Sequence, residues 1–105
     1  MAKIPNKIEK KIKQFIGLLE KNNIRINQAI LYGSYAKGSA NKWSDIDLAL
    51  ISENFEGDRY NDITKLRDFI FSVDTDISPL PYRPEDFTVD DLFVKEIIKT
   101  GIRIV

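Results

Sequence analysis

The sequence contains neither cysteine nor histidine among its 105 residues. Without cysteine the chain forms no disulfides and no thiolate metal sites, which fits a reducing compartment. Without histidine it lacks the commonest general base and the commonest transition-metal ligand, so any metal must be held by oxygen atoms. Oxygen ligands favour Mg²⁺, or alternatively Mn²⁺, over zinc.

The sequence also lacks an excess of either charge and any long apolar run. Its 16 basic and 16 acidic side chains balance, so the general attraction that draws basic proteins to nucleic acid is missing, and we do not expect direct nucleic-acid binding. No apolar stretch has the length of a signal peptide or a membrane span, which predicts a cytoplasmic protein without membrane contact. No segment is rich enough in Gly, Ser or Pro to act as a linker, so residues 1–105 are predicted to form a single domain.

Apolar periodicity predicts helices and strands in alternation. Asn6 is expected to cap a first helix that runs to about Lys21, and a second helix is expected over about residues 61–71. Thr88 or Asp86 is expected to cap a third helix that Gly101 ends. Predicted strands cover residues 29–32, 45–50, 73–78 and 102–105. The segment with Pro79, Pro81 and Pro84 is expected to stay extended and outside a sheet interior.

The connection between the first two predicted strands determines their direction. Residues 33–44 are small and polar, with room for no more than a short helical turn, and a connection without a full helix favours an antiparallel pair. The predicted fold class is therefore α+β, with a mixed sheet flanked by helices.

Two short motifs in the middle of the chain indicate chemistry. Gly33 and Ser34 end the first strand with a turn that can aim backbone N–H groups and a hydroxyl at a phosphate. Asp45 and Asp47 stand two apart on the second strand, so both carboxylates lie on one face, roughly 6 to 7 Å apart at Cα. At that spacing they can share a divalent cation, and together the two motifs form the halves of a metal–triphosphate site.

The run from Gly33 to Leu48 resembles the signature of the DNA polymerase β nucleotidyltransferase superfamily: Gly-Ser, a spaced Gly, then Ser-Asp-x-Asp-Leu. It is most similar to the small branch of that superfamily, the minimal nucleotidyltransferases (MNT). The resemblance covers nearly the whole chain and implies a polymerase β palm-like fold. It also implies Mg²⁺-dependent transfer of a nucleoside monophosphate, AMP from ATP, to an acceptor hydroxyl.

The resemblance assigns a role to each motif residue. Gly33 and Ser34 would hold the β- and γ-phosphates, and Asp45 and Asp47 would ligate two Mg²⁺ ions. Lys37 stands where the family often has an arginine that reaches phosphate. Ser44 is placed with the nucleotide-binding residues, and its hydroxyl is expected to fix the turn that presents Asp45.

A third carboxylate completes the metal site of the family and helps to deprotonate the acceptor. Asp74 and Asp76 are both candidates, since they lie on the same face of the predicted third strand. We choose Asp76, because the run Asp76-Ile77-Ser78-Pro79-Leu80 is similar to the family's Asp, apolar residue and Pro-Leu run.

The resemblance also implies a partner. MNT proteins are commonly paired with HEPN-domain ribonucleases as toxin–antitoxin systems, in which the MNT protein neutralises the toxin, in some cases by transferring AMP to a tyrosine. A HEPN-domain partner is therefore expected. Two alternatives remain: an antitoxin that acts by binding alone, and a stand-alone enzyme acting on a small hydroxyl compound such as an aminoglycoside. The sequence leaves the base preference and the oligomeric state open, and a homo-oligomer is compatible with it.

Overall fold

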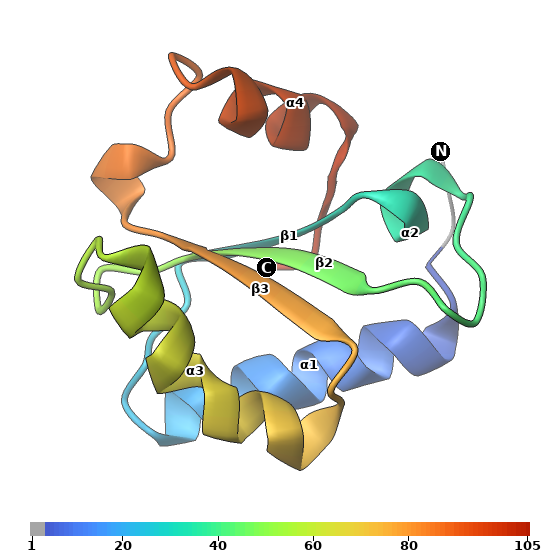
Figure 1. Cartoon of the computed structure of the whole chain (residues 1–105), viewed down its shortest axis with the longest axis horizontal. Helices are drawn as coiled ribbons and strands as arrows, with labels where there is room; N and C mark the ends of the chain where they lie inside the picture. Colours follow the sequence, from blue (N-terminus) through green and yellow to red (C-terminus); the bar gives the residue numbers. More distant parts are fainter. Residues whose placement is uncertain (1–3) are drawn as a thin grey trace.

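The computed structural model describes residues 4–105 and contains helices on both sides of one sheet (Figure 1). The order along the chain is α1 (Asn6–Lys21), β1 (Gln28–Tyr32), α2 (Ser34–Lys37), β2 (Ile46–Ile51), α3 (Arg59–Val73), β3 (Ile77–Tyr82), the 3₁₀ turn η1 (Pro84–Asp86), α4 (Leu92–Thr100) and β4 (Ile102–Arg103).

The sheet has the order β3-β2-β1-β4 and is mixed. β1 runs antiparallel to both β2 and β4, whereas β2 and β3 are parallel and α3 forms the crossover between them. The antiparallel pairing of the first two strands and the α+β class with a mixed sheet are confirmed.

The two faces of the sheet are covered unequally. Helices α1 and α3 lie side by side over one face, and α4 lies over β1 on the other (Figure 1). Apolar residues spaced three and four apart make α1 amphipathic, and its buried side packs on the sheet. Between these helices and the sheet lies the main core cluster. The residues that α1 contributes to it are Ile8, Ile12, Phe15, Ile16 and Leu19. On the opposite face of the sheet, α4 covers only part of the surface. We call the uncovered area over β2 and β3 the open face.

The start of α1 differs from the prediction. The helix ends at Lys21 as expected, but it begins at Asn6 itself, so Pro5 occupies the N-cap position and no side chain caps the helix. The carbonyl of Pro5 instead accepts from the N–H groups of Ile8 and Glu9. Because Pro5 already has an extended backbone, the helix can begin one residue before the predicted cap would allow.

The third strand was predicted wrongly. Helix α3 continues to Val73, and β3 occupies Ile77–Tyr82, so Pro79 and Pro81 lie inside a strand. β3 is at the edge of the sheet, where proline is tolerated if its missing N–H would face outward. The carbonyl of Asp76 accepts from Ile46 of β2, and that of Tyr82 accepts from Ser52 just after β2. By alternation the odd-numbered residues of β3, including both prolines, face away from β2.

The cap of the last helix was also predicted wrongly. Asp91 caps α4, and its carboxylate accepts from the N–H groups of Phe93 and Val94 at 2.8 and 3.2 Å. Gly101 ends the helix as expected, but with an extended backbone. Space explains this glycine, because a Cβ there would lie 2.5 Å from Ile30 Cγ2. No helix within residues 4–105 is long and apolar enough to cross a membrane.

Candidate active site

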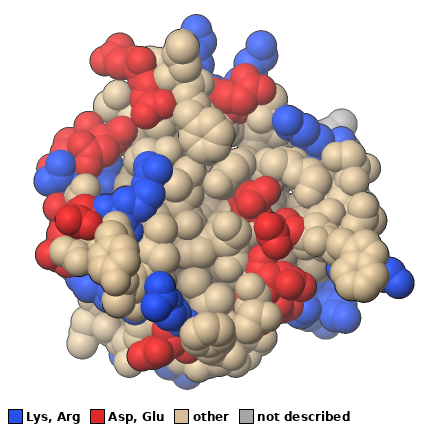
Figure 2. Space-filling model, viewed as in Figure 1, with Lys and Arg blue, Asp and Glu red and all other residues tan. Residues whose placement is uncertain are grey.

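The alternation of β2 places its carboxylates on the open face. Ile46, Leu48 and Leu50 point into the core under α1 and α3, whereas Ala49 and Ile51 pack with α4. Asp47, and Asp45 just before the strand, therefore project on the side of α4. Asp45 is exposed and Asp47 half-buried. Figure 2 shows acidic side chains gathered on this side over the starts of β2 and β3, beside a hollow in the surface.

The Gly33 turn is packed directly against Asp47. Gly33 has φ 74° and ψ −147°, which L-residues rarely adopt, and a Cβ at this position would lie 2.3 Å from Asp47 Oδ2. Its carbonyl accepts from the N–H of Lys37 at 3.1 Å and closes the single turn of α2. The Gly33 turn and the Asp47 carboxylate, which are separated in the chain by a loop, are therefore in direct contact.

Burial makes Asp47 an unfavourable place for an unpaired negative charge. Desolvation raises the pKa of Asp47, and the neighbouring charge of Asp45 raises it further. Tyr32, the cross-strand partner of Asp47, is neutral at physiological pH because burial raises its pKa to about 12. A bound cation would relieve the repulsion between the two carboxylates, so the residues present fit a divalent metal with oxygen ligands.

The predicted third carboxylate lies at the same edge of the site. The N–H of Ile46 donates to the carbonyl of Asp76 at 2.9 Å, which places Asp76 beside Asp45 in the parallel register. Within residues 4–105, however, no three His, Cys, Asp or Glu side chains are close enough to hold a metal ion. The three-carboxylate set is therefore not assembled in this structure, and the metal roles of Asp45, Asp47 and Asp76 stay predictions.

Asp74, the other candidate, already has partners. Its carboxylate forms an ion pair with Lys11 of α1, and its Oδ1 accepts from the N–H of Asp76 at 2.8 Å. The Lys11 ammonium holds the pKa of the Asp74 carboxyl below its usual range, helped by the Asp76 N–H. Asp74 thus fastens the start of β3 to α1, while the Asp76 side chain is exposed.

This ion pair gives a stability prediction. Lys11→Met is expected to lower the free energy of unfolding by about 1 kcal/mol at neutral pH, since the pair is partly buried. The lowered pKa of Asp74 means that its contribution is present above the unfolded pKa and is lost as pH falls through the folded one. Urea unfolding at neutral pH and near about pH 3 measures both effects. Lys13→Met is the control, because the Lys13–Glu9 pair is more exposed than the Lys11–Asp74 pair. An equal loss in both variants would contradict the prediction.

The two other predicted binding residues lie close to the turn. Ser44 accepts from the N–H of Asn41 at 2.9 Å, so its hydroxyl closes the loop before Asp45 as expected. Lys37 is exposed and lines a hollow of about 190 Å³ together with Tyr32, Gly33 and Phe93. The rings of Tyr32 and Phe93 meet edge to face at 5.8 Å. No sequence pattern predicts this pairing, because it depends on how α4 packs.

The comparison with protein families identifies this arrangement. The model of the nucleotidyltransferase domain family matches residues 7–104. The chain belongs to this family. It is the family that the Gly-Ser and Asp-x-Asp motifs indicated, and its members generally use divalent metals.

The nucleotidyltransferase also resembles individual proteins. It is 37% identical over 67 residues to a Methanocaldococcus jannaschii protein named as a protein adenylyltransferase; the match covers 60% of this chain and 46% of that protein, so it spans about half of the relative's length. A Sulfolobus solfataricus crystal structure described as a nucleotidyltransferase superposes with a TM-score of 0.67 at 14% identity, covering 92% of this chain and 78% of the other. A toxin–antitoxin structure with AMP-PNP gives 0.59 at 22% identity, covering 92% and 72%. At these identities the two structures show a shared fold.

Proposed function

We propose that this nucleotidyltransferase transfers AMP from ATP to an acceptor hydroxyl in a Mg²⁺-dependent reaction. The observation that carries the proposal is the contact between the Gly33 turn and Asp47, which puts a phosphate-binding backbone against a half-buried carboxylate. The name of the Methanocaldococcus relative supports adenylyl transfer over other nucleotidyl transfers.

Each residue at the turn has a defined task in the proposal. The N–H groups of Gly33 and Ser34 and the Ser34 hydroxyl bind the β- and γ-phosphates, with Lys37 in reach of the same anion. Asp45 and Asp47 would hold two Mg²⁺ ions, and Asp76 would complete the set of ligands. When bound, the ions neutralise the triphosphate and polarise the α-phosphorus.

The transfer is a single displacement. The acceptor oxygen attacks the α-phosphorus, the bond from that phosphorus to the oxygen bridging to the β-phosphate breaks, and pyrophosphate leaves. Asp76 accepts the proton of the acceptor hydroxyl and passes it to water. Asp76 suits this task better than Asp74, whose carboxylate is engaged by Lys11.

The proposed biological setting is a toxin–antitoxin pair in which a HEPN-domain ribonuclease supplies the acceptor. The toxin–antitoxin structure with the same fold supports this setting, as does the resemblance to the MNT branch. A tyrosine hydroxyl of the partner is the proposed acceptor.

Incubation with α-labelled ATP, CTP, GTP or UTP, Mg²⁺ and a HEPN-domain partner tests the proposal. Label from ATP is expected in the partner, and none is expected when the label is on the γ-phosphate, because that phosphate leaves with pyrophosphate. Asp47→Asn is expected to abolish the labelling, and Asp68→Asn is the matched control, since Asp68 is exposed on α3. A partner that is inhibited without becoming labelled would favour an antitoxin that only binds. Labelling of an aminoglycoside without any partner protein would favour the stand-alone enzyme.

A further inference from the structure

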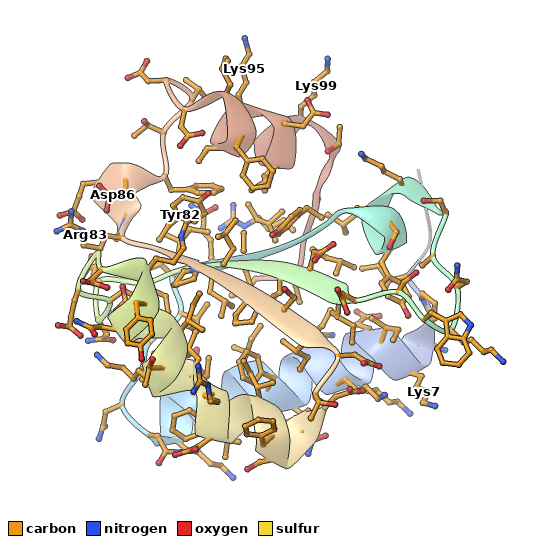
Figure 3. The ribbon with its side chains drawn as sticks, viewed as in Figure 1. Lys7, Tyr82, Arg83, Asp86, Lys95 and Lys99 are labelled. Atoms are coloured by element: carbon orange, nitrogen blue, oxygen red, sulfur yellow. The ribbon has the colours of Figure 1, made fainter. Side chains whose placement is uncertain are left out.

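A second hollow lies on the open face, at the opposite end of β2 and β3 from the carboxylates. Its volume is about 530 Å³, and it is lined by Gly57, Arg59, Pro81, Tyr82, Arg83, Asp86 and Asp91. We call it the Arg59 hollow. Tyr82, Arg83 and Asp86 lie together where β3 passes into η1 (Figure 3). The reaction proposed above uses none of these side chains.

One wall of the Arg59 hollow is fixed by a buried carboxylate. Asp62 is 1% exposed and accepts from the N–H groups of Glu56 and Gly57 at 2.8 and 3.0 Å. Gly57 has φ 91°, and a Cβ there would lie 2.6 Å from Arg83 Nε. The glycine therefore lets the Arg83 guanidinium lie flat against the loop, where Asp86 binds it at 2.8 Å.

Arg59 is the arginine of this hollow that binds no carboxylate in the described part of the chain. The carboxylate of Asp86 binds Arg83, and that of Asp91 accepts from two N–H groups of α4, whereas Arg59 forms no ion pair within the described part of the chain. Lys95 and Lys99 project from α4 away from the sheet and do not add to this charge (Figure 3). The two arginines and two aspartates of the lining balance in charge, but the Arg59 guanidinium keeps its N–H donors available for a carboxylate of a ligand.

Tyr82 supplies a second donor beside Arg59. The Arg59 guanidinium carbon lies 5.8 Å from the centre of the Tyr82 ring, and Phe87 packs against that ring at 5.1 Å. Burial raises the pKa of Tyr82, so its hydroxyl keeps its proton at physiological pH. A guanidinium and a phenol hydroxyl side by side are donors for one carboxylate.

The strand register relates this hollow to the catalytic carboxylates. Ser78 pairs with Asp47 in the parallel ladder, and Tyr82 follows four residues later on the same face. Because a strand rises by about 3.3 Å per residue, Tyr82 lies about 13 Å along the sheet from the level of Asp47. An extended peptide rises by the same amount per residue, so about four residues of an acceptor segment lying along β3 would bridge the distance.

We infer that the Arg59 hollow recognises an acidic side chain of a protein acceptor, about four residues from the hydroxyl that receives AMP. The inference rests on the proposed function, because it assumes an acceptor hydroxyl at Asp47. The balance of 16 basic and 16 acidic residues favours a peptide over a polyanionic RNA, whose binding requires several uncompensated cations.

Two pairs of capped Gly/Ala peptides test this inference on the full chain. Each peptide contains one tyrosine, and within a pair one peptide carries glutamate and the other glutamine. The variable residue lies about four residues before the tyrosine in one pair and about four residues after it in the other. Affinities are measured without nucleotide by NMR titration of ¹⁵N-labelled protein, and AMP transfer to the tyrosine is measured separately. The glutamate peptide is expected to bind about tenfold more tightly, through a charge-assisted hydrogen bond that glutamine cannot replace.

Arg59→Gln is expected to remove this preference, while Arg67→Gln, two turns further along α3 and exposed, keeps it. Equal binding of the two peptides in both pairs by the wild type, or a preference that survives Arg59→Gln, would overturn the inference. So would an oligoadenylate that shifts the Arg59 Nε resonance more strongly than the glutamate peptide does. If the wild type prefers glutamate but transfers no AMP, the hollow stands and the proposed reaction fails.

Discussion

Asp47→Asn is expected to lower the rate of AMP transfer by at least about a thousandfold, because a metal ligand contributing ~4 kcal/mol of transition-state stabilisation corresponds to that factor. The same substitution is expected to stabilise the metal-free protein. Burial and Asp45 raise the pKa of Asp47, so its ionised form destabilises the fold at neutral pH. Asparagine removes that charge and keeps the size of the side chain.

The sign of the stability effect follows from linkage. Since the folded pKa of Asp47 is raised, the carboxyl favours folding only below its unfolded pKa, and this advantage is lost as pH rises through the folded value. Asp47→Asn should therefore raise the melting temperature at neutral pH, by less than the ~4 to 8 °C that 1 kcal/mol gives a domain of this size. The gain should vanish in acid.

Two measurements check this expectation: transfer rates with labelled ATP, and thermal unfolding with and without Mg²⁺. Magnesium is expected to raise the melting temperature of the wild type and of Asp68→Asn, but not that of Asp47→Asn. Transfer at the wild-type rate by Asp47→Asn would remove the proposed metal site. A lower melting temperature without metal would show that Asp47 has a structural role instead.

Gly33→Ala is expected to damage both fold and activity. Its methyl group would meet Asp47 Oδ2 at 2.3 Å, and its backbone would have to keep a φ of 74°. Strain and overlap together are expected to cost about 2 to 4 kcal/mol of unfolding free energy. Any shift that relieves the overlap moves Asp47, and a displacement of about 1 Å at a catalytic group can cost about a hundredfold in rate.

Denaturant unfolding and kcat/KM for ATP measure the two effects of Gly33→Ala. Gly17→Ala is the control, since a Cβ on Gly17 would meet nothing within 4 Å and Gly17 lies inside α1. The control is expected to gain about 0.5 to 1 kcal/mol of stability and to keep its activity. If the two variants behaved alike, the close contact between the turn and the carboxylate would have no energetic importance.

The sequence predicted those elements whose pattern is set by one buried face. The 3.6-residue period of α1 and the alternation of β2 each reflect packing against the main core, so their positions were correct. The boundary between α3 and β3 was predicted wrongly. Proline is unfavourable inside a sheet, and nothing in the local sequence showed that β3 is an edge strand, where it is tolerated. Edge position depends on the order of all four strands.

The candidate site divides in the same way. The Gly33 and Asp47 motifs were visible locally, since each consists of neighbouring residues. The engagement of Asp74 depends on Lys11, 63 residues away in the chain, and no spacing rule reveals that pair. The approach of Arg59 to Tyr82 likewise depends on the α3 crossover, which returns the chain to the start of β3, so that the parallel strand ends beside the start of α3.

The outward edge of β3 has a consequence for how other chains can approach it. Pro79 and Pro81 have no N–H, and the N–H of Ile77 donates to the Asp74 carbonyl at 3.2 Å. The outward-facing residues from 77 to 81 therefore present carbonyl oxygens without a free donor. A neighbouring strand needs both kinds of group to pair, so the sheet cannot be extended at this edge. Backbone pairing, whether in aggregation or in strand exchange between copies, is blocked there, and a partner that covers β3 must recognise it through side chains.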